Sequence, residues 1–198
     1  MKKNLTLFFI MTFATTLTSM AQIVYHFSVG SAIGSEIIKD GNSYKSGFSP
    51  EFNFSYIGIF HEATPYLGLS IEGDLRLINV KNIDFFDKSY KEVGDLYCGI
   101  LIGFTNYNED FGLFLNGQIG YSLSGNGISD DTNLGSLSFK VSADVIINNV
   151  SIGVFYRPET QLIKLKSWAS VYGWSGGVDG FVLQPSWGIK VGVMWEGE

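Results

Sequence analysis

The chain has 198 residues, and its 24 glycines, 4 prolines and 30 aromatic residues form a composition typical of β structure rather than of helical or disordered chains. Its 19 acidic residues against 13 basic ones give a formal net charge of −6, which argues against nucleic acid as a partner. The single cysteine, Cys98, excludes an internal disulfide bond.

The amino terminus has the pattern of a signal peptide. Lys2 and Lys3 provide positive charge, and an apolar stretch over residues 5–13 follows them. Ser19 and Ala21 then place small side chains at the −3 and −1 positions of a cleavage site. We therefore expect cleavage after Ala21.

The expected organisation is a signal peptide over residues 1–21 and one domain over residues 22–198. The apolar stretch is too short to span a membrane as a helix, but a retained amino-terminal anchor is the alternative. Because no cysteine lies near the cleavage site, a bacterial lipid anchor is not expected.

Eight segments of the remaining sequence alternate bulky apolar residues with small or polar ones. A period of two residues is the signature of a β-strand with one apolar and one polar face. The last segment, from Phe181 to Trp195, breaks the pattern at Pro185, and at about 3.3 Å per residue it is long enough to cross a bilayer core of about 30 Å. The expected strands span approximately residues 24–34, 48–60, 67–78 and 93–105, start again near residues 111, 137 and 150, and end with residues 181–195.

The connections between these strands alternate between long and short. Outer-membrane barrels have short periplasmic turns and longer external loops on an even number of strands. The pattern therefore predicts an up-and-down barrel that starts in the periplasm, with a two-residue turn at Asn148-Asn149, because Asn tolerates positive φ. The long connections lie near residues 35–47, 79–92, 125–136 and 160–180, and the short ones near residues 61–65, 106–110 and 148–149.

The seventh strand is expected to contain an irregularity near Pro158 and Glu159. Its apolar residues occupy even positions as far as Tyr156, whereas beyond Pro158 they occupy odd positions, at Ile163 and Leu165. This inversion predicts a β-bulge, and we expect the strand to project beyond the membrane.

Alternation alone does not say which face points outward, and a soluble, lipocalin-like barrel would place the apolar face inside. The polar face here is rich in glycine, which suits the narrow lumen of an eight-stranded barrel. Aromatic residues gather at the predicted periplasmic ends of the strands, as in an interfacial girdle. The sequence thus predicts an all-β fold, an eight-stranded antiparallel up-and-down transmembrane β-barrel in an outer membrane. The girdle residues are Tyr25, Phe60, Phe104, Phe111 and Trp195.

The chain resembles the small, porin-like outer-membrane β-barrel domain family of Gram-negative bacteria over nearly all of residues 22–198. The residues that carry the resemblance are the Ala21-Gln22 junction and, in the last strand, Ser186, Gly188, Val191 and Val193. Those of the last strand are similar to the family's assembly signal, although residues 196–198 follow Trp195 where the family's strand ends on an aromatic residue. The resemblance implies insertion by the barrel-assembly machinery.

Nine charged residues fall on the face that is expected to line the lumen. Because buried charges need partners and five acids face four bases, the favoured interpretation is a network of ion pairs that fills the barrel. A proton or ion path is the alternative, and an open solute pore is not expected at this strand number. The nine residues are Glu51, Glu72, Asp74, Arg76, Asp95, Lys140, Asp144, Arg157 and Lys190.

Other patterns give weaker support to catalysis or metal binding. His26 and Ser28 resemble the His and Ser of outer-membrane lipid A deacylases, but both are expected on the lumen face, and no carboxylate completes a triad. Residues 130–133 offer oxygen atoms without the ligand spacing of a calcium site. We therefore expect no enzymatic activity, no metal and no cofactor.

Aromatic residues in the last long connection form a candidate contact surface. Trp168, Tyr172 and Trp174 offer rings to an external protein or glycan, and the alternative is that they cover the barrel mouth or extend the girdle. With outer-membrane lipid around the barrel, the favoured function is a structural or interaction scaffold that presents external loops. A narrow channel and a lipid-modifying enzyme are the alternatives.

Epitope insertion tests the expected topology. An epitope inserted at Asp84 or Asp130 should bind antibody on intact cells, because the long connections should be external. An epitope at Asn108, in a short connection, should bind only after the outer membrane is opened. Antibody binding in the reverse pattern would contradict this topology.

Overall fold

The structure, a computed structural model, describes residues 22–33, 35–61, 65–83, 89–104, 111–124, 134–164 and 181–197. These residues form β-strands and their turns, and none of them belongs to a helix long and apolar enough to span a membrane. The strands are β1 (Gln22–Ile33), β2 (Glu36–Lys39), β3 (Asn42–Lys45), β4 (Ser49–His61), β5 (Tyr66–Asn79), β6 (Tyr90–Gly103), β7 (Phe111–Ser124), β8 (Leu134–Ile147), β9 (Val150–Arg157), β10 (Thr160–Lys164), β11 (Phe181–Leu183) and β12 (Ser186–Glu196).

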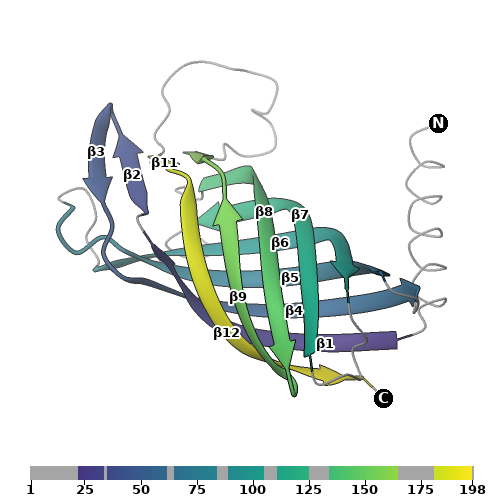
Figure 1. The fold of residues 1–198 in the computed structure, drawn as a ribbon. Helices are drawn as coiled ribbons and strands as arrows, with labels where there is room; N and C mark the ends of the chain where they lie inside the picture. The colour runs from purple at the N-terminus through teal and green to yellow at the C-terminus, as the bar shows by residue number, and fades with distance from the viewer. Residues whose placement is uncertain are drawn as a thin grey trace, which may run out of the picture.

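Eight of these strands close into an antiparallel barrel (Figure 1). Each pairs with the next in the order β1, β4, β5, β6, β7, β8, β9 and β12, and β12 returns to pair with β1. This is the up-and-down order that the sequence predicts. The turn from β8 to β9 is also the predicted one, because Asn148 and Asn149 have φ of 47° and 68°.

Four short strands, β2, β3, β10 and β11, continue the wall at one end of the barrel, and we call them the extension. β10 pairs with β8 and β11, β11 pairs with β2, and β2 pairs with β3. Figure 1 shows the β2–β3 hairpin standing beyond the barrel. The hairpin was not predicted from the sequence, because strands of four residues are too short for a period of two to stand out.

The passage from β9 to β10 contains the irregularity that the sequence predicts. Arg157, the last residue of β9, is buried, and after Pro158 and Glu159 the buried positions of β10 are Thr160 and Leu162. The inward positions therefore change from odd to even numbers at this point.

The expectation of one unbroken last strand from Phe181 to Trp195 was wrong. Gln184 and Pro185 separate β11 from β12, because proline has no N–H to donate to the neighbouring strand. Phe181 and Leu183 consequently face the interior, with 5% and 6% of their surface exposed, and do not share the outward face of Trp187.

The barrel carries its large apolar side chains on the outer face. Leu96, Ile152 and Ile189 are 64%, 58% and 55% exposed, although soluble proteins usually bury such residues. The lumen instead holds serine, asparagine and charged side chains that are almost fully buried. This arrangement excludes a soluble barrel with an apolar interior and is that of a transmembrane barrel.

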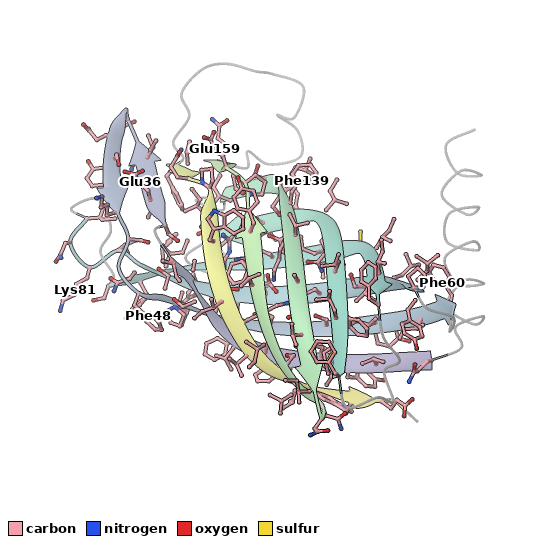
Figure 2. The ribbon with its side chains drawn as sticks, viewed as in Figure 1. Glu36, Phe48, Phe60, Lys81, Phe139 and Glu159 are labelled. Carbon is pink, nitrogen blue, oxygen red and sulfur yellow. The ribbon has the colours of Figure 1, made fainter. Side chains whose placement is uncertain are left out.

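An aromatic group marks the end of the barrel that carries the short turns. The ring of Tyr25 stacks on that of Trp195, with centroids 5.8 Å apart, and meets the ring of Tyr56 edge-on at 5.7 Å. Phe60 lies at the same end (Figure 2). Because amphipathic rings favour the membrane–water interface, this group fits the predicted girdle.

Glycines on the lumen face make room for large side chains of the neighbouring strand. A Cβ atom at Gly188 would overlap the ring of Phe155, and one at Gly153 would overlap the carboxylate of Asp144. The glycine-rich face therefore seats aromatic and charged side chains in a lumen that is too narrow for large residues on every strand.

The stability of variants at two adjacent residues tests which face of the wall meets lipid. Ile189 points outward and Lys190 is 2% exposed in the lumen. Ile189→Arg should lower the free energy of unfolding by about 2–4 kcal/mol, because it places a charge in the lipid core. Lys190→Arg keeps the lumen charge and should cost less. Reversible urea unfolding in lipid vesicles measures both, and an unchanged Ile189→Arg would show that Ile189 does not face lipid near the midplane.

Candidate functional site

The lumen collects the charged residues that the sequence assigns to the inward face. Alternate side chains of a strand point to opposite faces, so inward positions of several strands meet inside the barrel. None of the nine residues is more than 7% exposed. They lie on β4 (Glu51), β5 (Glu72, Asp74 and Arg76), β6 (Asp95), β8 (Lys140 and Asp144), β9 (Arg157) and β12 (Lys190).

Asp74 is the centre of this charge network. Its Oδ2 accepts hydrogen bonds from Lys140 Nζ at 2.7 Å and from Arg157 Nη2 at 2.5 Å. β5 and β9 stand opposite each other, with three barrel strands between them on either side, so the contact of Asp74 with Arg157 spans the lumen. Lys140 also pairs with Glu72, and Arg157 Nη1 donates to Glu51 Oε2 at 2.8 Å. The central cluster thus ties together β4, β5, β8 and β9.

Two further ion pairs flank the central cluster. Arg76 Nη2 donates to Asp95 Oδ1 at 2.8 Å, and Arg76 Nε lies 2.6 Å from Asp95 Oδ2. Lys190 Nζ lies 3.0 Å from Asp144 Oδ2, and Gly153 of β9, which pairs with both residues, leaves the space that this contact occupies. Each of the nine charges therefore has an opposite charge in contact, which offsets part of the cost of burial.

Two aromatic side chains fill the lumen beside the network. Lys140 Nζ lies 5.8 Å from the ring centroid of Tyr97 and 5.3 Å from that of Phe155, and Arg157 Cζ lies 4.5 Å from the Phe155 centroid. A cation at such a distance from a ring face is attracted to it. Sequence reasoning missed both aromatic residues, although each occupies an inward position between two outward residues.

An apolar cluster, which we call the turn-end plug, closes the lumen at the end with the short turns. Seven of the eight barrel strands contribute to it, so it fills the cross-section. Sequence reasoning missed this plug, but the signal was present in β4, where apolar residues occupy both faces from Tyr56 to Phe60. Its members are Val24, Ile57, Ile59, Tyr66, Leu101, Phe114, Ile146 and Met194.

A second apolar cluster, which we call the extension-end plug, lies at the other end. It joins buried residues of β2, β10 and β11 to the paired ends of β5 and β6 and to Val80 and Ile83, which follow β5. The charge network therefore lies between two apolar layers. Its members are Ile37, Ile78, Val80, Ile83, Val93, Leu162, Phe181 and Leu183.

His26 forms its hydrogen bond with a residue other than Ser28. Its Nε2 lies 2.7 Å from Ser151 Oγ, whereas Ser28 Oγ donates to Asn53 Oδ1 at 3.3 Å. Gly192 of β12 pairs with both Ser28 and Ser151, and its missing side chain lets the imidazole reach β9. All these side chains lie in the lumen, away from the lipid face.

Several sequence predictions concern residues outside the described ranges. These are the signal peptide over residues 1–21, the oxygen-rich residues 130–133, and the candidate contact residues Trp168, Tyr172 and Trp174. They stay predictions from the sequence.

Comparison with known structures agrees with the observed fold. The structure is similar to that of the outer membrane enzyme PagL, with a TM-score of 0.50 and 14% identity over 83% of this chain and 97% of that one. Weaker likenesses are to Neisserial surface protein A, NspA (TM-score 0.44, 13% identity, 86% and 96% covered), and to Ail, the attachment invasion locus protein of Yersinia pestis (TM-score 0.41, 15% identity, 89% and 100% covered). No family profile and no curated protein matches the sequence.

The chain therefore has the fold of the small eight-stranded outer-membrane barrels, as predicted. Its apolar outer face agrees with a location in the outer membrane of a Gram-negative bacterium. At these sequence identities the likeness concerns the fold, so the role of the chain has to be argued from its own lumen and surface.

The pair of Lys190 and Asp144 tests how the lumen charges support stability. Lys190→Met should lower the free energy of unfolding in lipid vesicles by about 3–5 kcal/mol, because it leaves a buried carboxylate unpaired. Adding Asp144→Asn should recover most of that loss, because no charge is then uncompensated. Lys81→Met, at an exposed lysine, is the matched control and should stay within about 0.5 kcal/mol of wild type. A double variant less stable than Lys190→Met would show that the unpaired charge is not the cause.

Proposed function

We propose that this outer-membrane barrel is closed and acts as a scaffold that presents its external connections and the extension to partners outside the cell. The observation that most supports the proposal is the filled lumen, in which the charge network lies between two apolar plugs. A wall braced from inside in this way gives its loops a rigid base, and loops on rigid scaffolds commonly carry binding functions.

The filled lumen argues against a narrow channel. A permeating ion would have to separate Asp74 from Lys140 and Arg157, whose charged atoms are in contact. It would also have to cross the turn-end plug, where side chains such as Phe114 have no polar atoms to replace its water shell.

A lipid-modifying enzyme is the other alternative, since PagL is named as an enzyme. Catalysis depends on a site rather than on a fold, and a lipid substrate approaches from the outer face. The hydrogen-bonded pair here, His26 and Ser151, is 3% and 0% exposed and faces the lumen. We therefore propose a non-enzymatic role. Hydrolysis of lipid A that is lost in Ser28→Ala or Ser151→Ala would contradict this proposal.

The proposed partners follow from the sequence of the connections and of the last strand. The connection between β10 and β11 contains Trp168, Tyr172 and Trp174, and aromatic residues are suited to bind a glycan or a protein. The last strand resembles an assembly signal, so we propose insertion by the barrel-assembly machinery.

Conductance measurements test the closed barrel. Purified protein in planar bilayers should give no stable conductance steps, because the plugs and the network occupy the lumen. A porin reconstituted in the same way serves as the positive control, and insertion of the chain is verified by its protection from protease. Uniform conductance steps from a homogeneous sample would contradict the closed barrel and support the channel.

A further inference from the structure

The outward side of the barrel wall changes its chemical character where β9 passes into β10. On β9 the outward residues Ile152 and Tyr156 are apolar or aromatic. The first two outward positions beyond Pro158 are Glu159 and Gln161, and both are exposed. The change takes place over a few residues of one chain segment.

The inward side changes from charged to apolar at the same place. Arg157, the last inward residue of β9, is 2% exposed and belongs to the charge network. Leu162, an inward residue of β10, is 0% exposed and belongs to the extension-end plug. The interruption at Pro158 thus exchanges the two faces of the wall.

β11 and β12 show the same exchange next to this segment. On β12 the outward Trp187 is 63% exposed, whereas on β11 the inward Leu183 is part of the extension-end plug. Between them, the amide of Gln184 donates to the Glu159 carboxylate at 3.1 Å on the outward side. Val182, the outward apolar residue of β11, is half-buried and pairs with β2.

β5 and β6 change character at this end without an interruption. The inward residues pass from Arg76 to Ile78 along β5 and from Asp95 to Val93 along β6. Arg76 and Val93 are paired across the two strands, so both changes lie at one height. The outward positions at this end of β6 are Glu92 and Tyr90, and both are exposed.

A change of the surrounding solvent accounts for all these observations. Where lipid surrounds the wall, apolar side chains are stable on the outer face and charged side chains are strongly disfavoured there. Where water surrounds the wall, the fold is instead stabilised by burying large apolar side chains on the inner face. These separate parts of the chain change beside one another, since Val93 of β6 and Leu162 of β10 belong to the same plug, and a common boundary explains this where a local turn does not.

We propose that the lipid–water boundary at this end of the barrel crosses the wall at Pro158 and Pro185. The rings of Tyr156 and Trp187, whose centroids are 4.6 Å apart, lie in the lipid headgroup region just below it, where amphipathic rings are favoured. The extension stands in water above it, and its buried apolar residues belong to the extension-end plug, which it shares with the ends of β5 and β6. Figure 2 shows Glu36 and Glu159 at this end and Phe60 at the opposite end.

This inference deepens the proposed function, because it identifies the part of the wall that a partner outside the membrane can touch. Three outward positions test it: Ile189 below the boundary, Trp187 at it and Gln161 above it. In a Cys98→Ser background, each position is changed to cysteine and labelled with a small fluorophore. The labelled proteins are then placed in vesicles whose lipids carry a nitroxide either at the headgroup or deep in the acyl chain.

The expected loss of fluorescence differs at each position. The label at 189 should be quenched most by the acyl-chain nitroxide and the label at 187 most by the headgroup nitroxide, whereas the label at 161 should be quenched least by both. β-Sheet circular dichroism confirms that each labelled protein is folded. Strong quenching at 161 by either lipid, or quenching at 187 mainly by the acyl-chain nitroxide, would overturn the placement. Conductance is measured separately, so a conducting barrel with the expected quenching order would contradict the closed scaffold and leave the boundary intact.

Discussion

A charge buried in a lumen between two apolar layers must have an opposite charge in contact, and the interior of this barrel is organised by that requirement. The contact of Asp74 with Arg157 joins opposite walls, and Lys140 joins a third strand to the same carboxylate. Because these contacts span the lumen, a shift of one strand by a single residue would turn its charged side chains towards lipid and leave their partners unpaired. The network therefore specifies the register of strands that do not touch each other directly.

The same β-sheet wall is surrounded by lipid in the barrel and by water in the extension. In the barrel, apolar side chains face lipid and polar ones face each other across the lumen, whereas in the extension the apolar side chains of Leu162 and Leu183 turn inward. Two short interruptions, each with a proline, are sufficient for this exchange, because the loss or gain of one residue in the alternation reverses the faces of a strand. A β-sheet can therefore continue out of the membrane as a folded platform without a separate domain.

Much of this architecture follows from the period of two residues. It predicts the eight barrel strands, the irregularity near Pro158 and the inward placement of the charged residues, whereas the Asn148-Asn149 turn follows from the tolerance of Asn for positive φ. It does not predict which charges meet, because the contact of Asp74 with Arg157 depends on the diameter of the closed barrel and not on spacing along one strand. The period also assigned Phe181 and Leu183 to the outward face, which was wrong. The alternation of residues continues through Pro185 in the sequence, whereas the strand is interrupted there. The period does not predict the plugs, because it assigns the apolar residues of each strand to the outward face. Ile57 and Ile59 are apolar residues that point inward.

The space that glycines leave for neighbouring side chains in the lumen also limits how the sequence can diverge. The ring of Phe155 occupies the volume over Gly188, and the carboxylate of Asp144 occupies the volume over Gly153, so each pair shares one fixed space. A larger residue at either glycine is compatible with folding only if the neighbouring residue has already been replaced by a smaller one. If the glycine were replaced first, the lumen would be overfilled. In relatives of this chain, a larger residue at the glycine position should therefore accompany a smaller residue at the paired position. Along each lineage the replacement by the smaller residue should come first.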